Sequence, residues 1–278
     1  MFEGRKLVIA TKHQKEVAIA PVLEAGLGVQ CMVPADLDTD SLGTFTGEVE
    51  RSDDPVTTAR KKCHLALEVT GCDLGVASEG SFGPHPSMFF IPADDEILVF
   101  VDSRNGLELV VRELSTQTNF AGAEIRSENE LKEFAERALF PAHGLILRKS
   151  PKDPEAIVKG IRDWSHLKRE FHAFLDQYGS AYVETDMRAM HNPSRMKVIA
   201  DAAQKLTLRL RTTCPACETP GFGVSEAKKG LPCALCQYPT RSVLSYIHTC
   251  LKCSYTKEEM FPKGIREEDP MYCDVCNP

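Results

Sequence analysis

Two patterns of hydrophobic and polar positions divide the first 150 residues into strands and helices. Short apolar runs at residues 6–10 and 74–77 predict buried strands. Apolar positions spaced by three and four over residues 14–25 and 57–70 predict amphipathic helices, and a glycine follows each of them. Strand and helix patterns that alternate in this way predict an α/β fold.

A second group of patterns extends this fold. Apolar runs over residues 96–102 and 107–114 flank the turn sequence Ser-Arg-Asn-Gly and predict a β-hairpin. Ser127 and Glu130 form the capping-box pattern that begins a helix, and residues 144–149 predict another strand. Together these elements predict a mixed sheet flanked by helices.

Helical patterns return after a polar, proline-containing stretch at residues 150–163, which we interpret as a linker or a surface excursion. Residues 165–179 predict an amphipathic helix that ends at a glycine. A long helix then begins with Asn192 as N-cap and Pro193 at its first position. We therefore predict one α/β domain over residues 1–212.

Four Cys-x-x-Cys pairs occupy the remaining segment, residues 213–278, and they are separated by 15, 13 and 19 residues. Two thiolates at this spacing can ligate one ion from a tight turn, and two such turns complete a tetrahedral site that suits Zn²⁺. The segment has few large apolar residues, so we expect the metal to supply much of its folding free energy. The sequence predicts a small double zinc ribbon with the ligands Cys214, Cys217, Cys233, Cys236, Cys250, Cys253, Cys273 and Cys276.

The sequence does not determine which two of these pairs bind the same ion. Sequence order favours one zinc held by the first and second pairs and another held by the third and fourth, and a nested or crossed arrangement is the alternative. Four thiolates leave no coordination position for a substrate, so we expect both zinc ions to be structural. A redox motif or an iron–sulfur cluster is the competing interpretation.

Charge narrows the classes of function. A formal net charge of −7 argues against a general binder of nucleic acids or anionic membranes, because both favour basic surfaces. Residues 214–278 hold seven Lys and Arg against eight Asp and Glu, so a protein partner suits this segment better than a nucleic acid. No apolar run reaches the ~20 residues that span a bilayer. The amino terminus has no signal-peptide pattern, and we expect a cytoplasmic protein.

Acids and cations that suit phosphate chemistry are spread through the α/β domain. Glu79 lies at the end of a predicted strand, and the neighbouring Gly80 permits a close backbone approach. Hydrolysis of a phosphoanhydride needs carboxylates that hold Mg²⁺ and cations that balance the developing charge. The carboxylates are Glu50 and Glu79, which would hold the metal and the water. The cations are Lys15, Lys62 and Arg195, which would bind phosphate. The predicted catalytic set is Glu50, Glu79, Lys15, Lys62 and Arg195.

The order of these motifs resembles that of the inosine/xanthosine triphosphate pyrophosphatase superfamily over residues 6–83 and 192–210. The stretches that carry the resemblance are "LVIATKHQKE", "ARKKC", "SEGSFG" and "NPSRM". The resemblance implies a Mg²⁺-dependent hydrolase of nucleoside triphosphates that contacts its ligand through Thr11, His13 and Gly80. As a whole, the chain also resembles an uncharacterised bacterial family that ends in tandem Cys-x-x-Cys pairs.

A non-catalytic adaptor is the alternative to this hydrolase. In that case the α/β domain binds a small ligand or none, and the zinc ribbon docks a protein. The two hypotheses differ in geometry, because a hydrolase requires its acids and cations to meet at one place in the fold. Side chains that diverge into solvent would favour the adaptor.

Overall fold

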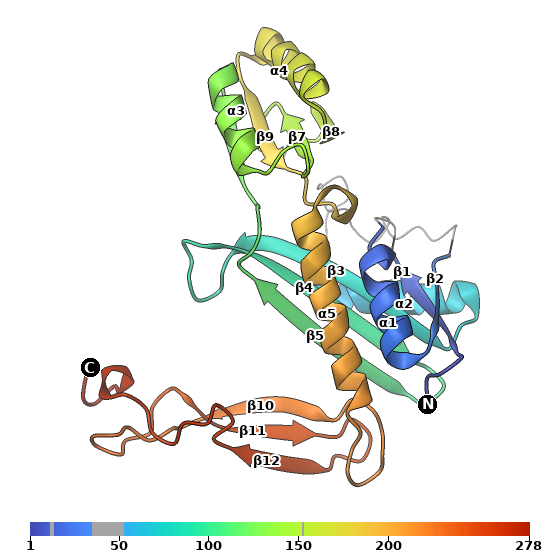
Figure 1. Ribbon diagram of the computed structural model, residues 1–278, viewed down its shortest axis with the longest axis vertical. Helices are drawn as coiled ribbons and strands as arrows, with labels where there is room; N and C mark the ends of the chain where they lie inside the picture. The colour runs from blue at the N-terminus through green and yellow to red at the C-terminus, as the bar shows by residue number, and fades with distance from the viewer. Residues whose placement is uncertain (12–13, 35–52, 152) are drawn as a thin grey trace. The chain divides into compact units, whose positions relative to one another are not determined.

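The computed structural model describes residues 1–11, 14–34, 53–151 and 153–278. These residues form two compact units, Met1–Leu206 (unit 1) and Thr207–Pro278 (unit 2). Unit 1 contains two sheets and unit 2 contains one (Figure 1). None of the described helices is both long and apolar enough to cross a membrane.

The first sheet of unit 1 has five strands in the order β2-β1-β3-β4-β5. β1 pairs in parallel with β2 and β3, whereas β3, β4 and β5 pair antiparallel. The predicted mixed sheet and its hairpin are therefore confirmed. The strands are β1 (Lys6–Ala10), β2 (Gln30–Met32), β3 (Leu74–Pro84), β4 (Pro92–Asp102) and β5 (Leu107–Ser115).

Two helices, α1 (Glu16–Leu27) and α2 (Pro55–Thr70), connect the parallel strands. The carboxylate of Asp54 accepts hydrogen bonds from the first turn of α2, and Gly71 ends the helix in the left-handed conformation. α1 runs two residues past its predicted end. The reason is that Gly28, with φ at 68°, provides its left-handed cap in place of the earlier glycine.

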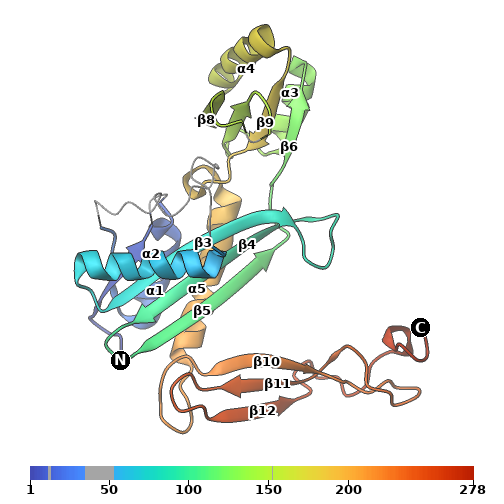
Figure 2. The same cartoon turned by 180° about the vertical axis from the view of Figure 1, so that it is seen from behind.

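The two helices cover opposite faces of the sheet, and Figure 2 shows α2 in front of it with α1 behind. β2 and β3 flank β1 on opposite sides, so right-handed crossovers through α1 and α2 must pass over opposite faces. On the α2 face, Cys63 and Ala66 pack against Ala77 and Val99. The carboxyl ends of β1 and β3 form a topological switch point, where open α/β sheets bind ligands.

The second sheet of unit 1 is antiparallel, with the order β6-β9-β7-β8. Its strands are β6 (Gly122–Ile125), β7 (Leu145–Arg148), β8 (Ile157–Ile161) and β9 (Ala181–Thr185). Helices α3 (Glu128–Arg137) and α4 (Trp164–Tyr178) supply apolar side chains to its core. The stretch interpreted as a linker or excursion contains β8.

A short 3₁₀ helix, η2 (Ala189–His191), leads into the long helix α5 (Pro193–Arg211). The side-chain oxygen of Asn192 accepts a hydrogen bond of 3.0 Å from the backbone N–H of Arg195. The predicted cap is thus present, and it places Arg195 in the first turn of α5.

Unit 2 holds an antiparallel sheet in the order β10-β11-β12. Its strands are β10 (Gly223–Lys229), β11 (Val243–Thr249) and β12 (Thr256–Met260), and a 3₁₀ helix η3 (Pro270–Tyr272) follows. The strands carry few buried side chains, and most residues of β10 and β12 are exposed. A sheet this thinly covered needs another source of stability.

Candidate functional site

The eight cysteines predicted as metal ligands gather in two groups of four in unit 2. Within each group, the sulfur atoms all lie within 4.8 Å of one another. Among the described residues, no other three His, Cys, Asp or Glu side chains approach so closely. The first group is Cys214, Cys217, Cys250 and Cys253, and the second is Cys233, Cys236, Cys273 and Cys276.

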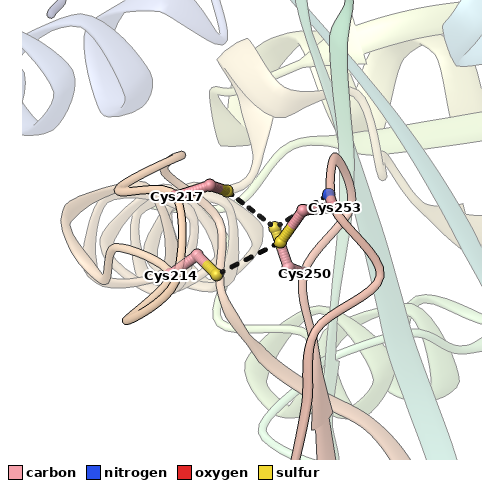
Figure 3. A group of neighbouring side chains, drawn as sticks. All are labelled: Cys214, Cys217, Cys250 and Cys253. Carbon is pink, nitrogen blue, oxygen red and sulfur yellow. Dashed lines mark hydrogen bonds between the residues drawn. The ribbon is translucent and has the colours of Figure 1, made fainter.

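The sulfur separations fit a metal ion and exclude disulfides. In the first group, Sγ of Cys214 lies 3.7 Å from that of Cys253, and Cys217 lies 3.6 Å from Cys250 (Figure 3). The corresponding pairs of the second group are 3.8 and 3.6 Å apart. A disulfide needs about 2.0 Å. A tetrahedral ion about 2.3 Å from each sulfur, the distance of zinc, places the sulfurs ~3.8 Å apart.

The Cys-x-x-Cys turns, which we call knuckles one to four in chain order, repeat one backbone pattern. In knuckle one, the backbone N–H of Glu218 donates a hydrogen bond of 2.8 Å to the carbonyl of Cys214. Glu218, Gln237 and Ser254, each directly after a knuckle, all adopt left-handed φ values of 57°, 61° and 58°. This shared turn points the two thiols of a knuckle toward the same side.

The thiolate, which is the metal-binding form of cysteine, is favoured at Cys217 of knuckle one. The Thr219 hydroxyl lies 3.2 Å from Sγ of Cys217. Hydrogen bonds from this hydroxyl and from the Thr219 backbone lower the pKa of Cys217 to about 6. A thiolate is therefore present at neutral pH for a metal to bind.

The pairing that sequence order favoured is wrong, because the knuckles interleave. Knuckle one shares its group with knuckle three, and knuckle two shares its group with knuckle four. β10 leads away from knuckle one and β11 returns antiparallel, with Gly223 opposite Thr249, so that knuckle three arrives beside knuckle one. Knuckle two lies at the other end of this hairpin, where Lys229 is opposite Val243, and the chain after β12 brings knuckle four to it.

A second concentration of functional groups is a cluster of buried charged side chains in unit 1, where β1 ends. Lys15 Nζ donates a hydrogen bond of 3.0 Å to the carbonyl of Ser78 and lies 4.0 Å from Oε2 of Glu96. Arg195 Nε donates a hydrogen bond of 2.6 Å to Oε1 of Glu96. All of these side chains are buried. They join the start of α1, strands β3 and β4, and the start of α5.

Burial and charge pairing act against each other in this cluster. Burial lowers the pKa of Lys15 to about 8, although Glu96 opposes the shift. Burial alone would raise the pKa of Glu96, but Arg195 and Lys15 outweigh it and hold that pKa below its usual range. Burial, and after it the charge of Glu96, raise the pKa of Asp94 to about 8. Strongly shifted pKa values in one buried place are typical of functional sites.

Lys62 and Glu79 form a buried ion pair on the other face of the sheet, beneath α2. Successive residues of a strand point to opposite faces, which separates Glu79 from its neighbour Ser78. β1 last pairs with β3 where Ala10 is opposite Ala77, so residues 78–80 border the region beyond the end of β1 on both faces. The charges of Glu79 and Lys62 act on Lys15 across this region.

Gly80 is opposite Glu96 in the pairing of β3 with β4. A Cβ at this position would lie 2.3 Å from Oε1 of Glu96 and 2.5 Å from Nη2 of Arg195. The glycine therefore leaves the room that the Arg195–Glu96 ion pair occupies. The guanidinium of Arg195 also lies 5.0 Å from the centre of the Phe82 ring.

The remaining predicted site residues are placed as follows. Thr11, directly after β1, is buried, and its Oγ1 has no hydrogen-bond partner among the described residues. His13 and Glu50 lie outside the described residues. The fold gathers Lys15, Lys62, Glu79, Gly80 and Arg195 around the end of β1, and their roles there stay predictions.

Sequence reasoning missed two acids of this cluster, Asp94 and Glu96. The signal was present in "ADDEILVF", where acids at alternate positions continue the strand face that carries Leu98 and Phe100. Acids on the buried face of a strand require partners, and the partner of Glu96 is Arg195, 99 residues away. That separation hides the pair from any local pattern.

Fold and sites together define an α/β protein whose C-terminal unit contains two four-cysteine groups that could each hold a metal ion. The profile of a family described as a domain of unknown function (DUF6671) matches residues 62–278, and the chain belongs to that family. The match includes both cysteine groups and, of the buried cluster, Lys62, Glu79, Asp94, Glu96 and Arg195. A comparison with curated proteins finds no significant match.

Proposed function

We propose that unit 1 binds a phosphorylated small molecule of the nucleotide class at the end of β1 and hydrolyses it with the help of Mg²⁺. The observation that carries this proposal is the gathering of three buried cations, Lys15, Lys62 and Arg195, with buried acids at a topological switch point. Buried charges weaken a fold unless they are well paired, so a structural role alone gives little reason to keep so many in one place.

The position of the cluster supports a phosphate ligand. Lys15 directly precedes α1, a helix of 12 residues whose N-terminal end carries the positive end of the helix dipole and so favours an anion. Arg195 lies in the first turn of α5. Lys15 and Arg195, which are far apart in the sequence, therefore meet in the fold, where they would hold phosphate oxygens.

Mg²⁺ would be held by Glu79, with Glu50 from outside the described residues as its predicted companion. When bound, the ion would supply Lewis-acid chemistry, stabilising negative charge on the phosphate groups and lowering the pKa of a water molecule. The chain itself contributes cations that orient the phosphates and a buried setting that excludes bulk water. The resemblance to the inosine/xanthosine triphosphate pyrophosphatase superfamily supports this assignment as a hypothesis.

For unit 2, we propose that both cysteine groups hold structural zinc. Four thiolates fill a tetrahedral ion completely, and they leave no position for a substrate. The poorly covered sheet of unit 2 then owes much of its folding free energy to the metal.

The test of hydrolysis is an assay of released phosphate and pyrophosphate from a panel of nucleoside triphosphates with Mg²⁺. Glu79→Gln should lower the rate by roughly 100-fold or more, because it removes a carboxylate from the site. Glu108→Gln is the matched control, since Glu108 is a half-exposed acid paired with Arg60. Equal rates for Glu79→Gln and the parent would remove Glu79 from the mechanism.

The test of phosphate binding is calorimetric titration with inorganic pyrophosphate. Lys62→Gln should weaken binding, whereas Lys61→Gln, at the neighbouring exposed lysine paired with Asp53, should not. A parent protein that neither binds pyrophosphate nor hydrolyses any member of the panel contradicts the proposed function.

A protein-docking role for unit 2 is the second candidate, and it is favoured by the exposure of apolar residues inside the knuckles. Leu235, Leu251 and Val275 lie between ligating cysteines and are 73%, 51% and 56% exposed. If the parent binds no phosphate compound, this adaptor role becomes the leading hypothesis. A cross-linking experiment with a photoreactive group at position 235 would then identify the surface in contact.

A further inference from the structure

Asp94 is a buried acid for which the described part of the chain supplies no hydrogen-bond partner. Five acids of the described chain are buried, and four of them contact a basic side chain. The exception is Asp94, which is 1% exposed and has no hydrogen-bond partner for either oxygen among the described residues. The four paired acids are Glu79 with Lys62, Glu96 with Arg195, Asp102 with Arg5, and Asp186 with Arg188.

The location of Asp94 explains why its lack of a described hydrogen-bond partner is informative. Asp94 and Glu96 are two positions apart on β4, so both side chains lie on the strand face that carries the buried cluster. Glu96 is already engaged, because it accepts hydrogen bonds from Arg195 and from Ser78, at 2.6 and 3.3 Å. Two buried oxygens without a described hydrogen-bond partner are unfavourable in a folded protein, and a bound cation would satisfy both of them.

We propose that Asp94 is a direct ligand of a divalent cation that enters the site together with the phosphate groups of the ligand. This inference rests on the proposed function and relocates its metal, because Asp94 shares a sheet face with Glu96 whereas Glu79 lies on the opposite face. Mg²⁺ and Mn²⁺ take only one or two protein carboxylates when phosphate oxygens and water complete their octahedral shell. Asp94 supplies two oxygens that no described side chain occupies.

Charge explains why cation and anion must enter together. Burial raises the pKa of Asp94 to about 8, so a bound metal would displace a proton from it; Glu96 and the resulting Asp94 carboxylate then balance Lys15 and Arg195, two charges of each sign. A divalent cation alone would leave a buried excess of two positive charges, which is unfavourable in a medium of low dielectric constant. Pyrophosphate brings the negative charges that remove this excess. The affinities for the metal and for the anion should therefore be coupled, and linkage requires the same factor in both directions.

The experiment measures this coupling in the full-length, zinc-loaded protein. Pyrophosphate affinity is determined by calorimetry with and without Mn²⁺, and Mn²⁺ binding is followed separately by electron paramagnetic resonance with and without pyrophosphate. In the parent, Mn²⁺ should strengthen pyrophosphate binding by roughly tenfold or more. Asp94→Asn should reduce this factor to about one while metal-free pyrophosphate binding persists, since the cations of the site remain.

Asp95→Asn is the matched control. Asp95 is the next residue of the same strand, points to the other face and pairs with Arg112 at the surface. This variant should keep the coupling of the parent. Fluorescence of Trp164, the single tryptophan, shows whether each variant retains the fold of unit 1.

The possible outcomes distinguish a failure of the inference from a failure of the proposed function. Loss of coupling in Asp94→Asn with coupling retained in Asp95→Asn supports the inference. Coupling that survives in a folded Asp94→Asn variant overturns it, and so does a parent that binds pyrophosphate equally with and without Mn²⁺. Both of these results leave the phosphate site standing. A parent that binds no pyrophosphate under either condition overturns the inference, and if it also hydrolyses no member of the nucleotide panel it overturns the proposed function itself.

Discussion

Removal of whole knuckles tests the interleaved metal centres by stoichiometry. Replacing both cysteines of knuckle one by alanine leaves its group with two thiolates, which is too few for a stable tetrahedral site. Since β10 has seven residues, the two groups lie roughly 20 Å apart along the hairpin, and the second should be unaffected. The expected zinc content falls from two ions per chain to one, as measured by elemental analysis of the purified protein.

Combining two knuckle removals separates the alternatives. With interleaved centres, loss of knuckles one and three still leaves one zinc, whereas loss of knuckles one and two leaves none. Sequential pairing predicts the reverse for the two combinations. A structural zinc site contributes an apparent ~10–16 kcal/mol of folding free energy, so loss of both ions should unfold unit 2.

Titration with Co²⁺ provides a control for the zinc analysis. Co²⁺ bound by four thiolates absorbs strongly in the visible and near-ultraviolet, and titration of each variant with Co²⁺ counts the intact sites independently of zinc analysis. One ion retained after loss of knuckles one and two would refute the reasoning from the sheet register.

Three further predictions concern unit 1. Gly80→Ala should destabilise the protein by about 1–3 kcal/mol, because the added Cβ would collide with the Arg195–Glu96 ion pair. Urea unfolding measures this change, and Gly83→Ala, whose added Cβ would have no described atom within 4 Å, should be nearly neutral. Iodoacetamide at pH 8 should label the partly exposed Cys72 but spare Cys63, whose pKa burial raises to about 12; equal labelling contradicts this. Burial lowers the pKa of His143, so only the unfolded chain gains its proton near pH 6.5. Stability should therefore fall as pH drops below that value, by at most about 1.4 kcal/mol per pH unit, and His143→Gln should flatten the slope seen in Trp164 fluorescence.

Local patterns in the sequence determined most of the secondary structure and the identity of the metal ligands. The hairpin of β4 and β5, the cap at Asn192 and the repeated knuckles each depend on residues a few positions apart. Backbone sterics and short-range hydrogen bonds fix such elements, and these forces can be read from neighbours in the chain. β2 was missed because it has three residues, none of them buried, and gives no hydrophobic period.

Tertiary structure alone decided which knuckles lie together and which charges are paired. The register of an antiparallel hairpin brought knuckle three beside knuckle one, and no local rule encodes that register. Glu96 found Arg195 across 99 residues, while Asp94, two positions away, found no partner among the described side chains. The chain folds under the combined constraint of burying apolar faces and compensating buried charge, and only the complete packing shows which buried charges are paired.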